Sequence, residues 1–366
     1  MKPLPDYPWD QMVPFAERAR AHPDGIVDLS IGSPVDPTPA VIRQALADAT
    51  DAHAYPQTAG TPQLQWAIIE WYARRRGVLG LTEANVLPTI GSKELVALLP
   101  FMLGLGEGDT VVHPVAAYPT YAIGAAMAGA DAVAADNPAD WPATTKLVWL
   151  NSPGNPDGNV LTVAELRQAV DRARSLGAVI VSDECYAELG WAGDWLTDPI
   201  PSILDPRVIG TDRRDVLAIY SLSKQSNMAG YRGAFAAGCA TVLGRLLTVR
   251  KHAGLMLPAP LQAAMVAALG DDAHVAEQKE RYRARREMLL PAVEAAGFRI
   301  QRSEAGLYLW ASEGRDAWES IGRLADLGIL AGPGPFYGAG SAQQVRFSLT
   351  ATDERIAAAA ERLKGA

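Results

Sequence analysis

The sequence predicts an α/β protein in which a mainly parallel β-sheet carries helices on both faces and a smaller α+β unit follows. Short apolar runs, typical of buried strands, alternate with amphipathic stretches of helical period through the middle of the chain. From Asp271 onward the composition shifts to a long charged helical pattern and then to short strand patterns. A strand–helix–strand order favours parallel strands, because the crossing helix packs back onto the sheet.

The expected elements follow in chain order. Apolar runs predict strands at residues 110–113, 146–150, 178–182, 216–220 and 234–237. Amphipathic patterns predict helices at 61–76, at 93–103 with an interruption at Pro100, and at 162–176, where Thr162-Val-Ala-Glu165 matches a capping box. The alanine-rich stretch 124–135 predicts only tight helix or loop packing. The second unit is expected to hold a helix at 273–296, strands at 298–300, 306–310 and 345–349, and a last helix at 353–363.

Length and composition indicate a large globular protein. With 366 residues, of which 49% are apolar and 20% charged, the chain can form two domains or one large α/β unit. The net charge of −8 and the lack of a Lys/Arg block argue against a nucleic-acid partner. Only two cysteines, Cys185 and Cys239, fit a reducing cytosol, and the five histidines lack ligand spacing, so no metal is expected. Without a signal peptide or a bilayer-length apolar run, we expect a cytoplasmic protein with no membrane contact.

A lysine follows one of the predicted strands, and its neighbours suit a phosphate. Lys224 closes the run Asp215-Val-Leu-Ala-Ile-Tyr-Ser-Leu-Ser-Lys224, which contains Ser221 and Ser223, and Arg232 comes eight residues later. Lysine forms Schiff bases with aldehydes, and burial beside other cations lowers its pKa. Hydroxyl and guanidinium groups bind phosphate. The combination predicts pyridoxal phosphate (PLP), although alone such a lysine is more typical of a surface position.

The other groups that PLP requires occur at further strand and helix ends. Asp183 would keep the pyridine nitrogen protonated, Tyr186 and Asn155 would donate to the phenolate oxygen, and Tyr118 would stack on the ring. The N–H groups of Gly91-Ser92-Lys93, just before a helix, would hold the phosphate. Each has a plainer interpretation, such as a strand-end cap for Asp183 or a core position for Tyr118. Because parallel strands bind ligands at their carboxyl ends, we expect these residues in one cleft.

Taken together, the motifs resemble the class I/II aminotransferases, which are fold type I PLP enzymes, over nearly the whole chain. The resemblance rests on Gly91-Ser-Lys93, Asn155-Pro-Asp-Gly158, Asp183-x-x-Tyr186, Ser221-x-Ser-Lys224 with Arg232, and Val345-Arg-Phe-Ser-Leu-Thr350. Asp157 stands where the family usually has threonine, which leaves the role of the asparagine intact.

The resemblance implies a seven-stranded, mainly parallel sheet in a large domain at 39–270, and a small domain formed by 1–38 and 271–366. Lys224, Asp183 and Tyr186 would be catalytic, with Lys224 anchoring PLP and moving the substrate α-proton. Arg346 would bind the substrate α-carboxylate, with Gly32 and Asn155 also at the substrate. Tyr55 would reach the phosphate bound by a neighbouring subunit, which implies a homodimer with shared active sites.

The implied reaction moves an amino group between glutamate/2-oxoglutarate and another amino or keto acid. The segments 31–37 and 55–62 and the compact length are most similar to the actinobacterial-type N-succinyldiaminopimelate aminotransferases of lysine and diaminopimelate biosynthesis, with N-succinyl-LL-2,6-diaminopimelate as substrate. The apolar stretch 253–260 argues against a plain aspartate aminotransferase. Alternatives are LL-diaminopimelate, alanine, methionine or an aromatic amino acid as substrate, or a PLP-dependent carbon–sulfur lyase. A PLP-binding transcription regulator is disfavoured, because Gly32 comes too early for a preceding DNA-binding domain.

Overall fold

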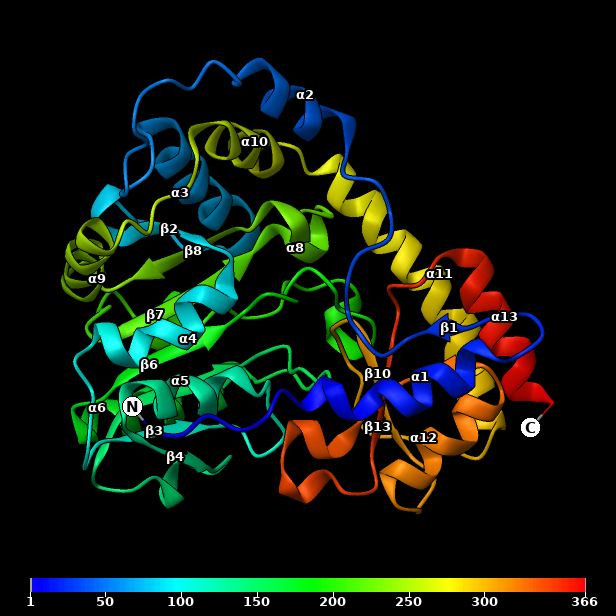
Figure 1. Cartoon of the computed structure of the whole chain (residues 1–366). Coiled ribbons are helices and arrows are strands. Elements are labelled where there is room, and N and C mark those ends of the chain that lie inside the picture. Colours follow the sequence, from blue (N-terminus) through cyan, green and yellow to red (C-terminus); the bar gives the residue numbers. More distant parts are fainter. Residues whose placement is uncertain (1, 366) are drawn as a thin grey trace.

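The protein is described by a computed structural model that covers residues 2–365, and a central β-sheet organises its larger part (Figure 1). The seven strands lie side by side in the order β2 (Val86–Ile90), β8 (Gly233–Gly238), β7 (Val216–Ser221), β6 (Val179–Asp183), β5 (Thr145–Asn151), β3 (Thr110–His113) and β4 (Asp131–Ala134). Only β8 runs antiparallel to its neighbours. The predicted mainly parallel sheet of seven strands is therefore confirmed.

The two edge strands, β2 and β4, were not among the strands located from the sequence. β2 contains Pro88, which an edge strand tolerates because one row of its backbone groups is unpaired. β4 is short and largely exposed, so it lacks the apolar run of a buried strand. The stretch 124–135, expected as helix or loop, instead holds the end of helix α5 (Thr120–Ala128) and the whole of β4. The expected interruption at Pro100 is also wrong, since α4 (Ser92–Met102) continues through it.

Helices cover both faces of the sheet, and strand alternation divides the apolar residues between them. In β7, Val216, Ala218 and Tyr220 face one cluster, while Leu217 and Ile219 face another. The first cluster is covered by α3 (Pro62–Arg76), α6 (Val163–Leu176), α7 (Pro206–Ile209) and α10 (Ala259–Gly270), with α2 (Ala40–Asp48) outside α10. The second is covered by α4, α5 and α9 (Ala240–Ala253). Both faces of the sheet are therefore packed, and the carboxyl ends of the strands are where a site is expected.

Helix α6 begins and ends as its sequence predicts. Thr162 Oγ1 accepts from the Glu165 N–H at 3.3 Å, and the Glu165 carboxylate accepts from the Thr162 N–H at 2.8 Å, which completes the capping box. Gly177 ends the helix with a φ of 63°, a left-handed conformation that glycine adopts without strain.

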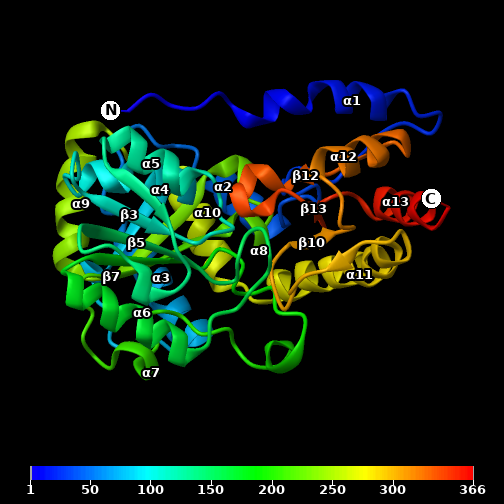
Figure 2. The ribbon, with the colours of Figure 1, turned by 90° about the horizontal axis from the view of Figure 1, so that it is seen from below.

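A second unit lies beside the sheet and has its own apolar core (Figure 2). Its antiparallel sheet has the order β12 (Gly332–Pro333), β13 (Val345–Ser348), β10 (Tyr308–Ser312) and β9 (Arg299–Ile300). Its helices are α1 (Val13–Arg20), α11 (Ala273–Ala295), α12 (Ala317–Asp326) and α13 (Asp353–Lys364). The N-terminal β1 (Val27–Asp28) pairs with β11 (Ile329–Leu330). The division into 39–270 and the flanking segments stays a prediction.

The segment that precedes α1 runs back over the larger unit, as the dark blue chain in Figures 1 and 2 shows. The Lys2 N–H donates to the Ala126 carbonyl at 2.9 Å, and Lys2 also pairs with Asp131. Within residues 2–365, the structure contains no helix with the length and apolar character needed to cross a membrane.

Replacing Asp36 with asparagine is expected to lower the free energy of unfolding by about 2 kcal/mol at pH 7. Asp36 accepts from the two terminal nitrogens of the buried Arg285 at 2.8 and 2.6 Å and from Gln278 at 2.8 Å, which fastens the segment around Gly32 to α11. Burial raises the Asp36 pKa, but these hydrogen bonds outweigh burial and hold the pKa below its usual value.

Because the folded-state pKa of Asp36 is lowered, its contribution is present at neutral pH and is lost as the pH falls through and below about 4. Urea unfolding of both proteins at pH 7 and at acid pH checks this, and a stability difference independent of pH would contradict it. Asp326→Asn is the matched control, since Asp326 pairs with Arg18 at the surface and its loss is expected to cost less than about 1 kcal/mol.

Candidate active site

A cavity of about 340 Å³ opens at the carboxyl ends of the parallel strands, between the two units. Asn151 ends β5, Asp183 ends β6 and Ser221 ends β7, and all three line the cavity. The predicted site residues that line it are Gly32, Ser92, Lys93, Tyr118, Asn155, Asp183, Tyr186, Ser221, Ser223, Lys224, Arg232 and Arg346. Gly91 precedes the lining residue Ser92. Tyr55 lies outside the cavity and is 95% exposed.

Lys224 lies in the one-turn helix α8 (Leu222–Gln225) that follows β7. Its amine donates to the Gly32 carbonyl. Burial is the main cause that lowers the Lys224 pKa; Arg346 and Arg232 lower it further, whereas Tyr308 and Cys185 oppose them. A lysine with a lowered pKa is more often neutral, and only the neutral amine is nucleophilic.

One end of the cavity has the groups that bind a phosphate. Helix α4 begins at Ser92 after Gly91, whose φ is 73°, and a Cβ at Gly91 would collide with the Arg232 guanidinium. Ser221 and Ser223 line the same cavity, and their hydroxyl oxygens lie 2.8 Å apart. The cavity thus offers a helix N-terminus, two hydroxyls and a guanidinium, all of which suit a phosphate, and the close approach of Arg232 leaves space only for glycine at position 91.

Asp183 is buried and has two donors. The Tyr121 hydroxyl donates to its Oδ2 at 3.0 Å, and the Cys185 N–H donates to its Oδ1 at 3.2 Å. Burial raises the Asp183 pKa, and these donors oppose that shift only in part. A buried carboxylate of this kind calls for a positively charged partner.

Asn151 connects two site residues through the backbone. Its side-chain amide donates to the Asp183 carbonyl at 2.9 Å, and its Oδ1 accepts from the Asn155 N–H at 2.7 Å. The Asn155 position is thus tied to the end of β6.

Arg346, from the small sheet, reaches across to the strand ends. Its Nη1 donates to Asn155 Oδ1 at 2.8 Å and its Nη2 to the Ser30 carbonyl at 2.7 Å. The guanidinium carbon lies 3.9 Å from the ring centroid of Tyr308 and 4.7 Å from that of Tyr337. Its buried Nε has no hydrogen-bond partner among the described residues. A buried, positioned guanidinium with an unused N–H is suited to a carboxylate.

The sequence did not single out several residues at the cavity. Tyr121 and Asn151 hold Asp183, and Tyr308 and Tyr337 flank Arg346. Aromatic side chains at the mouth are Tyr7, Trp9 and Phe336, with Trp9 and Phe336 in an edge-to-face contact at 5.2 Å. Tyrosines in apolar strands look like core residues, and the hydrogen-bond partners are distant in sequence, so a single sequence gives no signal for these roles.

The sheet, the second unit and this cavity define a PLP-dependent enzyme of fold type I. The chain belongs to the class I and II aminotransferases, since the model of the family described as aminotransferase class I and II matches residues 24–363.

Three relatives cover nearly the whole chain. It is 54% identical over 365 residues to the 4-dedimethylamino-4-oxo-anhydrotetracycline transaminase of Streptomyces rimosus, covering 99% of this chain and 100% of the relative. It is 53% identical to a probable aminotransferase of Mycobacterium tuberculosis, covering 98% and 85%. The LL-diaminopimelate aminotransferase of Aquifex aeolicus is 32% identical, covering 100% and 97%.

Solved structures show the same fold over the same length. An aminotransferase of Helicobacter pylori superposes with a TM-score of 0.88 at 26% identity, covering 100% of this chain and 99% of that one. A probable N-succinyldiaminopimelate aminotransferase of Thermus thermophilus gives 0.86 at 28% identity, covering 98% and 99%.

The residues present fit PLP. The groups around Gly91 suit the anionic phosphate, and the buried Asp183 suits the cationic ring nitrogen. The lowered pKa of Lys224 suits its attack on the aldehyde. When bound, PLP supplies an electron sink for the electrons that the substrate α-carbon releases. The chain supplies binding, orientation and proton transfer.

Proposed function

We propose that this aminotransferase moves an amino group between glutamate and the keto acid related to N-succinyl-LL-2,6-diaminopimelate. Amino-acid chemistry is supported by the observation that Lys224, Asp183 and Arg346 line one cavity. The diaminopimelate class is supported by the Aquifex aeolicus relative and by the Thermus thermophilus neighbour, which carry related substrate names.

The proposed roles divide the cavity into three parts. Ser92, Lys93, Ser221, Ser223 and Arg232, with the N–H groups after Gly91, hold the phosphate. With PLP bound, Asp183 would pair with the ring nitrogen, Tyr186 and Asn155 would donate to the ring oxygen, and Tyr118 would pack on the ring face.

At the substrate end, Arg346 binds the α-carboxylate beside Asn155 and Gly32. That contact would hold the α-hydrogen near Lys224, whose neutral amine would accept the proton from the α-carbon and, as ammonium, donate it to the imine carbon of the cofactor.

A second substrate class is favoured by the Streptomyces rimosus relative and by the cavity mouth. The name of that relative describes a 4-oxo compound, a polycyclic ketone. Tyr7, Trp9 and Phe336 offer aromatic surfaces on which such rings could pack.

Single-turnover mixing with a substrate panel distinguishes the two classes. We expect N-succinyl-LL-2,6-diaminopimelate to discharge the bound cofactor at least about tenfold faster than alanine, methionine, phenylalanine or LL-diaminopimelate, because its succinyl group adds binding contacts that the other four lack. Equal rates with alanine or methionine would contradict this substrate. Conversion of a polycyclic ketone that survives Arg346→Gln would support the second class, and release of pyruvate and ammonia without a keto acid would indicate a lyase.

We also propose a homodimer in which Tyr55 contacts the phosphate bound by the partner subunit. The support is the exposure of Tyr55 on this chain together with its motif. Activity retained by a monomer at high dilution in sedimentation measurements would contradict the shared site. A cytosolic location stays a prediction.

A further inference from the structure

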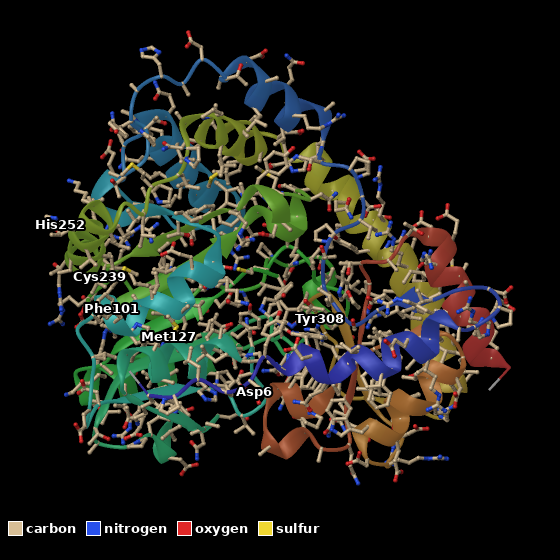
Figure 3. All side chains as sticks on the ribbon, viewed as in Figure 1. Asp6, Phe101, Met127, Cys239, His252 and Tyr308 are labelled. Carbon is tan, nitrogen blue, oxygen red and sulfur yellow. The ribbon has the colours of Figure 1, made fainter. Side chains whose placement is uncertain are left out.

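Tyr308 contacts several functional parts of the cavity and has no role in the scheme above. It lies near the centre of the molecule, between the two units (Figure 3). Its hydroxyl is 3.2 Å from the Tyr186 hydroxyl, and its ring packs against the Arg346 guanidinium at 3.9 Å. A Cβ at Gly32 would collide with the Tyr308 hydroxyl, and the Gly32 carbonyl accepts from Lys224.

The surroundings of Tyr308 are charged on the side of the cavity. Arg346 faces it from β13, Lys224 from α8, and Tyr186 from the segment after β6. Burial raises the Tyr308 pKa, but the charges of Arg346 and Lys224 outweigh burial and hold it below its usual value. The other titratable or charged groups around this cluster are Cys185, Arg232, Tyr118, Tyr282 and Tyr337.

The backbone places Tyr308 with Arg346 and apart from Tyr186. Strands β10 and β13 are paired, with Trp310 opposite Arg346, so Tyr308 and Arg346 belong to one sheet. Tyr186 follows the end of β6 in the larger sheet. The contact between the Tyr308 and Tyr186 hydroxyls therefore links the two sheets. One sheet carries Arg346, and the other carries the residues proposed to bind the cofactor.

We propose that Tyr308 is a positioning residue that couples carboxylate binding at Arg346 to Tyr186 and Lys224. The inference rests on the proposed roles of these three residues. A carboxylate that neutralises Arg346 changes the charge over the Tyr308 ring, and the hydroxyl then interacts differently with Tyr186. Hydrogen-bonded chains transmit such polarisation from one member to the next.

Tyr337 provides a matched control for Tyr308. Its ring also packs on Arg346, at 4.7 Å, but its buried hydroxyl has no hydrogen-bond partner among residues 2–365. Substitution of either tyrosine with phenylalanine keeps the ring against the guanidinium. Only Tyr308→Phe removes a hydroxyl that contacts another site residue.

The experiment titrates the visible absorbance of the PLP-bound protein against pH, with and without saturating propionate. Propionate has a carboxylate and no amino group, so it occupies Arg346 without reacting. In the wild type and Tyr337→Phe, we expect propionate to raise the midpoint, because its carboxylate offsets the charge of Arg346, which disfavours a protonated nitrogen at Lys224 when the cofactor is attached there. In Tyr308→Phe, the increase should fall to less than about half of the wild-type value.

The outcomes separate this inference from the proposed function. Equal increases in Tyr308→Phe and the wild type would overturn the coupling, as would a wild type that does not respond to propionate. A wild-type protein that binds no PLP would overturn the proposed function as well. If Tyr308→Phe does not fold, Tyr186→Phe tests the same link from its other end and should show the same reduced increase.

Discussion

Replacing Lys224 with alanine is expected to abolish the covalent attachment of PLP and to reduce transamination by about a thousandfold or more. Among residues 2–365, Lys93 is the one other lysine that lines the cavity, and its amine faces the ring of Tyr118 at 5.9 Å. Because we propose that Lys93 binds the phosphate, we do not expect it to replace Lys224. The reaction would lose both its cofactor anchor and its proton carrier. The loss should appear in kcat, since Arg346 and the phosphate end still bind their ligands.

Borohydride reduction followed by peptide mapping provides the direct measurement. The wild type should carry reduced cofactor on the peptide that contains Lys224, whereas Lys224→Ala should carry none. Lys279→Ala is the control, because Lys279 is a partly buried lysine outside the cavity, 5.9 Å from the Trp191 ring centroid. A Lys224→Ala protein that transaminated at the rate of the control would refute the assignment.

The sequence predicted the centre of the fold better than its edges. The run Val216-Leu-Ala-Ile-Tyr is apolar on both faces, because β7 is covered by helices on both sides, and such strands can be located from composition. β2 and β4 each have a neighbour on one side only, so they tolerate Pro88 and exposed residues and lose the strand pattern.

The site residues also divide into those that can be located from the sequence and those that cannot. Asp183 ends one strand of the sheet, and Lys224 and Asn155 follow two others, so topology alone brings them to one edge. Arg346 was expected only from the motif around it, because it arrives from a different sheet. Tyr308 and Tyr121 could not be found, since their importance depends on what lies opposite each hydroxyl and not on their neighbours in sequence.

Asp183 and Glu184 are adjacent buried carboxylates. We expect the change to an amide to lower kcat at Asp183 and to lower the free energy of unfolding at Glu184. Asp183 lines the cavity, and in the role proposed for it the amide of Asp183→Asn would lack the negative charge needed to keep the cofactor ring protonated. The expected loss of kcat is about a hundredfold or more. Glu184 points away from the cavity and accepts from Arg76 at 3.2 Å, from the Ser202 hydroxyl at 3.0 Å and from the Ile203 N–H at 2.7 Å.

Glu184→Gln leaves the Arg76 guanidinium buried without its ion partner, since both side chains are 1% exposed. The free energy of unfolding should fall by about 3 kcal/mol, while kcat of the folded protein stays near that of the wild type. The pair of variants thus separates chemistry from stability within two consecutive residues. A Glu184→Gln protein with unchanged stability, or an Asp183→Asn protein with unchanged kcat, would reverse the assignment.

Stability of the cofactor-free Asp183→Asn protein gives an independent check with a defined sign. Burial raises the folded-state pKa of Asp183, so its ionisation opposes folding of the cofactor-free chain. This penalty is absent below the usual aspartate pKa of about 4 and grows as the pH rises towards the folded-state pKa. Asp183→Asn removes the penalty, so its stability relative to the cofactor-free wild type should increase between pH 4 and pH 7. Added PLP should make the wild type more stable than Asp183→Asn, because only the wild-type carboxylate gains a cationic partner.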